Sequence, residues 1–121
     1  MDQADILYVV KYYKDSRGKS PFWKWLERLK DRKARATIKV RIDRVERGNL
    51  GDCRSLGNGI FEIKIRFGPG YRVYFGFLEQ AIVVMLMGGS KKTQSQDIER
   101  AKNLWVECKN AYENQNEKTF G

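Results

Sequence analysis

The sequence predicts a two-layer α+β domain, in which helices pack on one face of an antiparallel β-sheet. Three observations predict this class. Two runs alternate between apolar and polar residues, three longer runs carry apolar residues at helical spacing, and residues 81–87 are apolar throughout. Their order along the chain is strand, helix, helix, three strands and helix, or β-α-α-β-β-β-α.

The first part of the chain predicts one strand followed by a pair of helices. Residues 6–13 are β-branched and aromatic, which favours a strand. Ser20 and Pro21 predict the N-cap and the first position of a short helix. A second helix is expected from about residue 31 to residue 47, and Gly48 ends it. The apolar positions of the two helices are Phe22, Trp25, Leu26 and Leu29, then Ala34, Ile38, Ile42 and Val45.

Turn residues divide the second half of the chain into three strands. Residues 61–67 and 71–77 alternate on either side of Gly-Pro-Gly, which is typical of a β-hairpin. Residues 81–87 predict a central strand that is covered on both faces and ends at the two following glycines. These strands form an antiparallel meander, and the N-terminal strand is expected alongside it.

The C-terminal part predicts a last helix from about residue 95 to residue 112. Its apolar stripe consists of Ile98, Ala101, Leu104, Trp105 and Cys108. Residues 113–121 are polar, and we expect a flexible tail there. A single domain over residues 1–112 follows from these elements.

The chain is strongly basic and contains no histidine. Its 121 residues include 24 Lys or Arg and 15 Asp or Glu, which gives a net charge of +9. The lack of histidine excludes Ser-His-Asp and Cys-His catalysis, and two separate cysteines argue against a zinc site. No Gly-rich phosphate loop is present that would support nucleotide hydrolysis. The surplus of cations favours a nucleic-acid partner; the alternatives are a solubilising surface or an acidic partner.

Most of the excess charge lies in and around the two N-terminal helices. Residues 14–47 contain 13 basic and 5 acidic residues. The basic residues on the outer side of the helix pair are Lys30, Arg32, Lys33, Arg35, Lys39, Arg41 and Arg44. This face is either simply solvated or docks on nucleic acid or the ribosome.

Nothing in the sequence predicts contact with a membrane. No apolar run approaches the roughly 20 residues of a membrane span, and Asp2 and Asp5 argue against a signal peptide. We therefore expect a cytoplasmic protein in which Cys53 and Cys108 are reduced thiols.

The expected hairpin gathers cations on one side. If residue 67 pairs with residue 71, Arg66 lies opposite Arg72, and Lys64 lies opposite Tyr74. Two arginines that face each other repel, so an anionic ligand between them is a sensible explanation. The alternative is an ordinary solvated sheet surface.

Two further features bear on this cluster. Glu62, which the same register places opposite Gly76, partly neutralises the cations. Residues 88–92, Gly-Gly-Ser-Lys-Lys, leave the central strand toward the last helix and are able to hold a phosphate, although basic loops are common.

These segments resemble a known family. LGNGIFEIKIRFGPGYRVYFG at residues 56–76 and MGGSKKTQSQDIERA at residues 87–101 resemble the RelE/ParE superfamily of type II toxin–antitoxin toxins. The resemblance is greatest to its HigB-like branch, the addiction-module killer proteins. It covers about residues 5–110, including the order of the elements, and it implies the RelE-like fold.

The resemblance implies an mRNA interferase that enters the ribosomal A site and cuts the message there. Such toxins use no metal or other cofactor, because the 2′-hydroxyl attacks its own adjacent phosphate. Arg72 occupies the position expected to bind the scissile phosphate, and Lys64 is a base or a second clamp. Lys91 and Lys92 match further basic positions, and Tyr71 and Tyr74 stack a base or order the 2′-hydroxyl.

The proton carriers stay open, because relatives use a basic residue at position 62 or histidines that this chain lacks. Glu62, Asp97, a lysine and a tyrosine are the candidates for the general base. Residues and resemblance together give catalytic roles to Arg72, Lys64, Lys91, Glu62 and Tyr74, and RNA or phosphate contacts to Arg66, Lys92, Tyr71 and Ser90.

The resemblance also implies partners and leaves alternative functions open. A cognate antitoxin is expected, in the style of the HigA helix-turn-helix repressors, and operator DNA is reached only through it. The other implied partner is mRNA on the 70S ribosome. The first alternative is a ParE-like toxin that poisons DNA gyrase without cutting RNA, and the second is an inactive relic that only partners its antitoxin.

Overall fold

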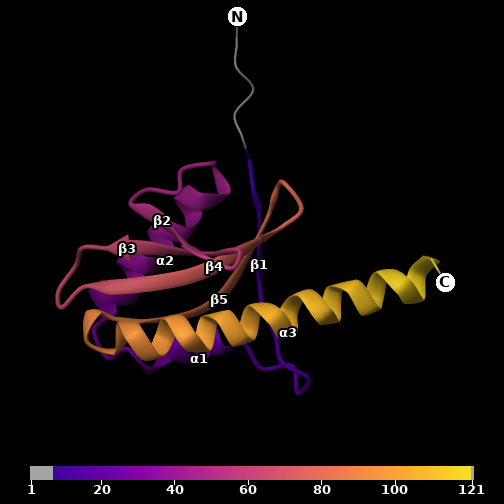
Figure 1. The fold of residues 1–121 in the computed structure, drawn as a ribbon. Helices are drawn as coiled ribbons and strands as arrows, with labels where there is room; N and C mark the ends of the chain where they lie inside the picture. The colour runs from indigo at the N-terminus through magenta and orange to yellow at the C-terminus, as the bar shows by residue number, and fades with distance from the viewer. Residues whose placement is uncertain (1–6, 121) are drawn as a thin grey trace, which may run out of the picture.

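The structure is a computed structural model that describes residues 7–120, with side chains through residue 115. A five-stranded sheet of order β1-β5-β4-β3-β2 forms its centre, with α3 in front and α2 behind in Figure 1. The elements are β1 Val9–Tyr12, α1 Pro21–Arg28, α2 Arg32–Glu46, β2 Cys53–Gly57, β3 Ile60–Ile65, β4 Tyr71–Leu78, β5 Ile82–Ser90, the short 3-10 helix η1 Lys91–Thr93 and α3 Gln94–Phe120. The α+β class is confirmed.

Both N-terminal helices begin where the sequence predicts. The hydroxyl of Ser20 accepts a hydrogen bond from the Trp23 backbone N–H at 3.2 Å, and Pro21 occupies the first turn of α1. The Asp31 carboxylate caps α2 in the same way, accepting from the backbone N–H groups of Lys33 and Ala34 at 2.9 and 3.2 Å. The predicted apolar positions of α2 are all buried.

The strands place alternate residues in two separate cores. One core joins α1 and α2 to the face of the sheet that carries Ile63, Val73 and Met85. The other joins α3, through Ala101 and Trp105, to the opposite face. The expectation that helices pack on one face therefore holds for α1 and α2. α3 lies on the other face, because β4 and β5 are apolar on both sides and need a second cover.

The hairpin register differs from the predicted one by two residues. Lys64 pairs with Arg72 and Glu62 with Tyr74, so Arg66 lies in the loop rather than opposite Arg72. The loop is longer than Gly-Pro-Gly because a turn closes within it, with the Gly70 N–H donating to the Phe67 carbonyl at 3.0 Å. A shift of two keeps every side chain on its predicted face.

Four elements also differ from the predictions. β2 was not expected, because it is a short, mostly exposed edge strand with little apolar pattern. β1 starts at Val9 and pairs parallel to β5, so the sheet is mixed; the start predicted at residue 6 lies outside the described residues. β5 continues through both glycines to Ser90. α3 continues to Phe120 and projects past the sheet, so residues 113–120 are helical (Figure 1).

No helix in the described part of the chain is both long and apolar enough to cross a bilayer.

Candidate active site

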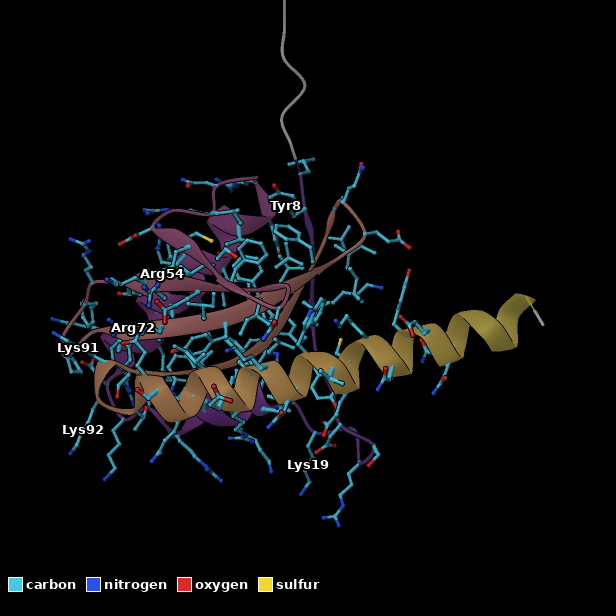
Figure 2. The ribbon with its side chains drawn as sticks, viewed as in Figure 1. Tyr8, Lys19, Arg54, Arg72, Lys91 and Lys92 are labelled. Carbon is cyan, nitrogen blue, oxygen red and sulfur yellow. The ribbon has the colours of Figure 1, made fainter. Side chains whose placement is uncertain are left out.

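A cationic hollow lies at the end of the sheet where the β3–β4 loop meets η1. Its volume is about 440 Å³, and its charged lining residues are Lys64, Arg66, Arg72 and Lys91. Figure 2 shows Arg72 and Lys91 at this end of the sheet, with Arg54 close by, whereas Lys19 lies apart from them at the bottom of the view. No acidic residue lines the hollow in the part of the chain that the structure describes. We call it the phosphate hollow.

Backbone pairing brings these cations together. Lys64 on β3 lies directly opposite Arg72 on β4, and Arg72 lies opposite Gly89 on β5. The Lys91 backbone N–H donates to the Gly70 carbonyl at 3.2 Å, which fixes the start of η1 against the hairpin loop. Three separate segments of the chain therefore supply charge to one hollow.

Glu62 is buried behind this hollow and holds several side chains. It is 1% exposed. Its Oε1 accepts from Arg54 Nε at 2.9 Å, and its Oε2 accepts from Gln94 Nε2 at 2.8 Å. Arg72 Nε lies 3.8 Å from the same Oε2. Because its oxygens are engaged and buried, Glu62 is placed to position Arg72 rather than to receive a proton from a substrate.

Arg72 is the buried cation of the site. The residue is 5% exposed, and its Nε and Nη1 are buried without a hydrogen-bond partner among the described residues. Buried N–H groups are nearly always hydrogen-bonded in native proteins. A guanidinium with free donors at the wall of a cationic hollow is suited to bind an anion such as a phosphate.

The two predicted site tyrosines lie outside the phosphate hollow. Tyr74 is fully buried, and burial, with Glu62 and Asp97 nearby, raises the pKa of its hydroxyl. Tyr71 points to the other face of the sheet, where its ring lies 6.2 Å from that of Trp25. Neither ring lines the phosphate hollow.

The other predicted residues divide between the rim and a neighbouring hollow. Arg66 is on the rim, where its 79% exposed side chain pairs with Asp52 at 3.2 Å. Lys92 is exposed and extends outward from the loop before α3 (Figure 2). Ser90 and Asp97 line a second hollow between α1, β5 and α3. Six predicted residues therefore do not line the phosphate hollow: Glu62, Tyr71, Tyr74, Ser90, Lys92 and Asp97.

Two residues of the site had no role in the predictions. Arg54, which pairs with Glu62, lies on the unexpected strand β2, whose weak apolar pattern gave no signal. Gln94 begins α3 and donates to Glu62. The sequence could have indicated Gln94, because this residue lies within the second segment that resembles the toxin superfamily, residues 87–101.

The basic outer face of the helix pair is largely exposed, as expected. Two of its arginines are held by the fold: Arg35 donates to the Leu29 carbonyl, and the Arg41 guanidinium covers Gly51. The remaining members are exposed, namely Lys30, Arg32, Lys33, Lys39 and Arg44. In the described residues, His, Cys, Asp and Glu side chains form no group of three or more that could bind a metal.

Comparison with known proteins identifies the family. Residues 24–105, which include the phosphate hollow and the start of α3, match the family model of the phage-derived Gp49-like proteins (DUF891). The chain belongs to this family. The Gp49-like family is a family of toxin–antitoxin toxins related to RelE and HigB. An uncharacterized protein of Haemophilus influenzae is 47% identical over 83 residues, which cover 69% of this chain and 84% of that relative.

Proposed function

We propose that this Gp49-like protein is a toxin that cleaves mRNA on the ribosome, in the manner of the HigB-like interferases. The observation that carries the proposal is Arg72, whose buried donors lack partners at the wall of a hollow lined by three further cations. An RNA phosphodiester is an anion that such a hollow attracts and orients. A gyrase poison that acts only by binding has no need of a buried, unpaired phosphate ligand.

The proposed reaction is an internal displacement at phosphorus. The 2′-oxygen forms a bond to the adjacent phosphorus and loses its proton, while the bond from phosphorus to the 5′-oxygen breaks. The 5′-oxygen leaves and takes up a proton. The products are a 2′,3′-cyclic phosphate and a 5′-hydroxyl, so atoms and charge balance without a metal ion or other cofactor.

Charge stabilisation is the main contribution that the site offers to this reaction. Negative charge grows on the non-bridging oxygens as the fifth bond to phosphorus forms. Arg72 is held rigidly by burial and by Glu62, so its donors are organised before the substrate arrives. Lys64 and Lys91 add charge from the neighbouring strands.

Proton transfer requires residues that line the phosphate hollow. Glu62 and Tyr74 are buried and outside its lining, and Asp97 lines the second hollow. Lys64, Lys91 and solvent therefore remain for the 2′- and 5′-oxygens.

The proposed partners follow from the same function. The exposed basic face of α1 and α2 docks on ribosomal RNA in the cytoplasm, since phosphates attract clustered Lys and Arg. A HigA-like antitoxin neutralises the toxin.

Inducing the chain in cells, with and without the neighbouring open reading frame, tests the proposal. We expect growth arrest, with new 5′ ends in translated messages at codon spacing, and rescue by the antitoxin. DNA breaks and an SOS response with intact messages would instead identify a gyrase poison. Normal growth on induction of the folded chain would identify an inactive relic.

A further inference from the structure

A second hollow lies beside the phosphate hollow, between α1, the end of β5 and the start of α3. Its volume is about 570 Å³, which is within the usual range for sites that bind small organic molecules. Trp25 and Tyr71 form an aromatic corner, with ring planes at 66°. Lys24, Arg28 and Arg100 supply positive charge, and Asp97 is the one acidic residue in its lining among the described residues.

The strand at the floor of this hollow is shaped for close packing. A Cβ at Gly88 would lie 2.3 Å from the Trp25 ring, and a Cβ at Gly89 would lie 1.8 Å from Asp97 Oδ2. The two glycines face opposite sides of the sheet, so the Trp25 ring lies against the backbone on the α1 side and the Asp97 carboxylate on the α3 side. In the described residues β1 pairs with β5 only along residues 82–85, so no strand covers this end of β5 on the side away from β4.

The second hollow and the phosphate hollow lie at the same end of β4 and β5. Arg72, which lines the phosphate hollow, pairs across the sheet with Gly89, which lines the second hollow. At the end of β5, Ser90 lines the second hollow and the next residue, Lys91, lines the phosphate hollow. A nucleotide whose phosphate contacts Arg72 therefore has its neighbouring base near Gly89 and Asp97. The uncovered edge of β5 connects this position with the aromatic corner on the other face of the sheet.

Asp97 gives the lining of the second hollow a fixed hydrogen-bond acceptor. Its Oδ2 accepts from the Thr93 hydroxyl at 2.5 Å, which fixes the carboxylate and leaves further acceptor positions. A carboxylate accepts hydrogen bonds only. Guanine alone among the four RNA bases presents two adjacent N–H donors, at N1 and N2, on its pairing edge.

We infer that the second hollow binds a guanine base next to the scissile phosphate. The base stacks at the corner of Trp25 and Tyr71 and donates to Asp97, while Arg28 and Arg100 contact the flanking backbone. The inference rests on the proposed RNA cleavage, and it makes Asp97 a specificity residue rather than a proton carrier.

Binding to the isolated protein tests this site without the ribosome. Guanosine 3′-monophosphate should shift the amide NMR signals of Gly88 and Gly89 and the indole N–H signal of Trp25. The 3′-monophosphates of adenosine, cytidine and uridine should shift them only at concentrations at least about fivefold higher. Equal response to all four nucleotides, or shifts confined to residues of the phosphate hollow, would overturn the inference.

Cleavage mapping with Asp97→Asn tests the role in specificity. The amide keeps the acceptor for Thr93 but cannot accept from both guanine donors, so the preference for guanine at the cut should fall at least about fivefold. Glu99→Gln is the matched control, because Glu99 lies half a turn along α3, is exposed and is absent from the lining. A guanine preference unchanged in a cleaving Asp97→Asn chain would overturn the inference and leave the proposed function standing. If the chain binds guanosine 3′-monophosphate selectively but cuts no RNA, the result would support the guanine site and contradict the proposed RNA cleavage.

Discussion

Arg72 Nε lies 3.8 Å from Glu62 Oε2, and both side chains are almost fully buried. This separation is too long for a hydrogen bond, so the carboxylate attracts the guanidinium without using its donors. Glu62 hydrogen-bonds instead to Arg54 and Gln94. One buried carboxylate thus fixes the position of the Arg72 guanidinium and leaves its donors available for the proposed phosphate.

Glu62→Gln should destabilise the fold. Removing the carboxylate leaves Arg72 buried without an opposite charge, and we expect a loss of about 2–4 kcal/mol in the free energy of unfolding. Asp52→Asn is the matched control, because Asp52 pairs with Arg66 on the exposed rim, where the loss should stay below about 1 kcal/mol. Urea unfolding of the three chains measures both values. Equal losses in the two variants would show that Glu62 has no special structural role.

Lys91 and Lys92 should differ sharply in their contribution to cleavage. They are adjacent, exposed and identical in type, but only Lys91 lines the phosphate hollow. Lys91→Ala should lower the rate of message cleavage by about 100-fold, since it removes a charge beside the reacting phosphate. Lys92→Ala should change it by less than about threefold, because solvent and salt screen that charge. Similar rates for the two variants would remove Lys91 from the site.

Tyr74→Phe should keep RNA cleavage, because the hydroxyl is buried and does not line the phosphate hollow. The substitution should instead change how the stability of the fold depends on pH in alkaline solution. Burial, aided by Glu62, raises the pKa of Tyr74 above its ordinary value of 10.0. The folded chain thus holds this proton more tightly than the unfolded chain, and the stabilisation is complete below pH 10.0 and is lost as the pH rises above it.

Urea unfolding at pH 9 and pH 11 measures this linkage. Between these pH values the free energy of unfolding should fall by about 1 kcal/mol more in the wild type than in Tyr74→Phe. Both chains contain the other tyrosines, so the contribution of those tyrosines cancels in the comparison. Equal losses would show that the hydroxyl is not desolvated. Loss of cleavage in a folded Tyr74→Phe chain would assign the hydroxyl to the chemistry.

Local sequence patterns predicted most of the fold, because strand alternation and helix caps are short-range signals. The predicted hairpin register was wrong by two residues, since the turn between Phe67 and Gly70 extends the loop. The side-chain faces were still correct, because an even shift preserves alternation. The apolar stripe of α3 was also predicted, but a stripe does not say which face of a sheet it covers.

The sequence predicted the cations of the candidate site but not the residues that surround them. Lys64, Arg72 and Lys91 were expected together and line one hollow. The burial of Glu62 depends on Arg54, which reaches it from an edge strand with little apolar pattern, and on Gln94 from α3. The aromatic corner joins Trp25 and Tyr71 from distant segments. Such contacts come from tertiary packing, which periodicity does not encode.

The chemical ends of a cleaved message test most directly whether the hollow around Arg72 cuts RNA. The purified chain would be added to a reconstituted translation reaction, beside Arg72→Ala, Arg72→Lys and the exposed control Arg17→Ala. We expect 2′,3′-cyclic phosphate and 5′-hydroxyl ends with the wild type and with Arg17→Ala. Arg72→Ala should be at least about 100-fold slower, with Arg72→Lys between them. An intact message with the wild type, or cleavage by a folded Arg72→Ala chain at the wild-type rate, would contradict the proposed site.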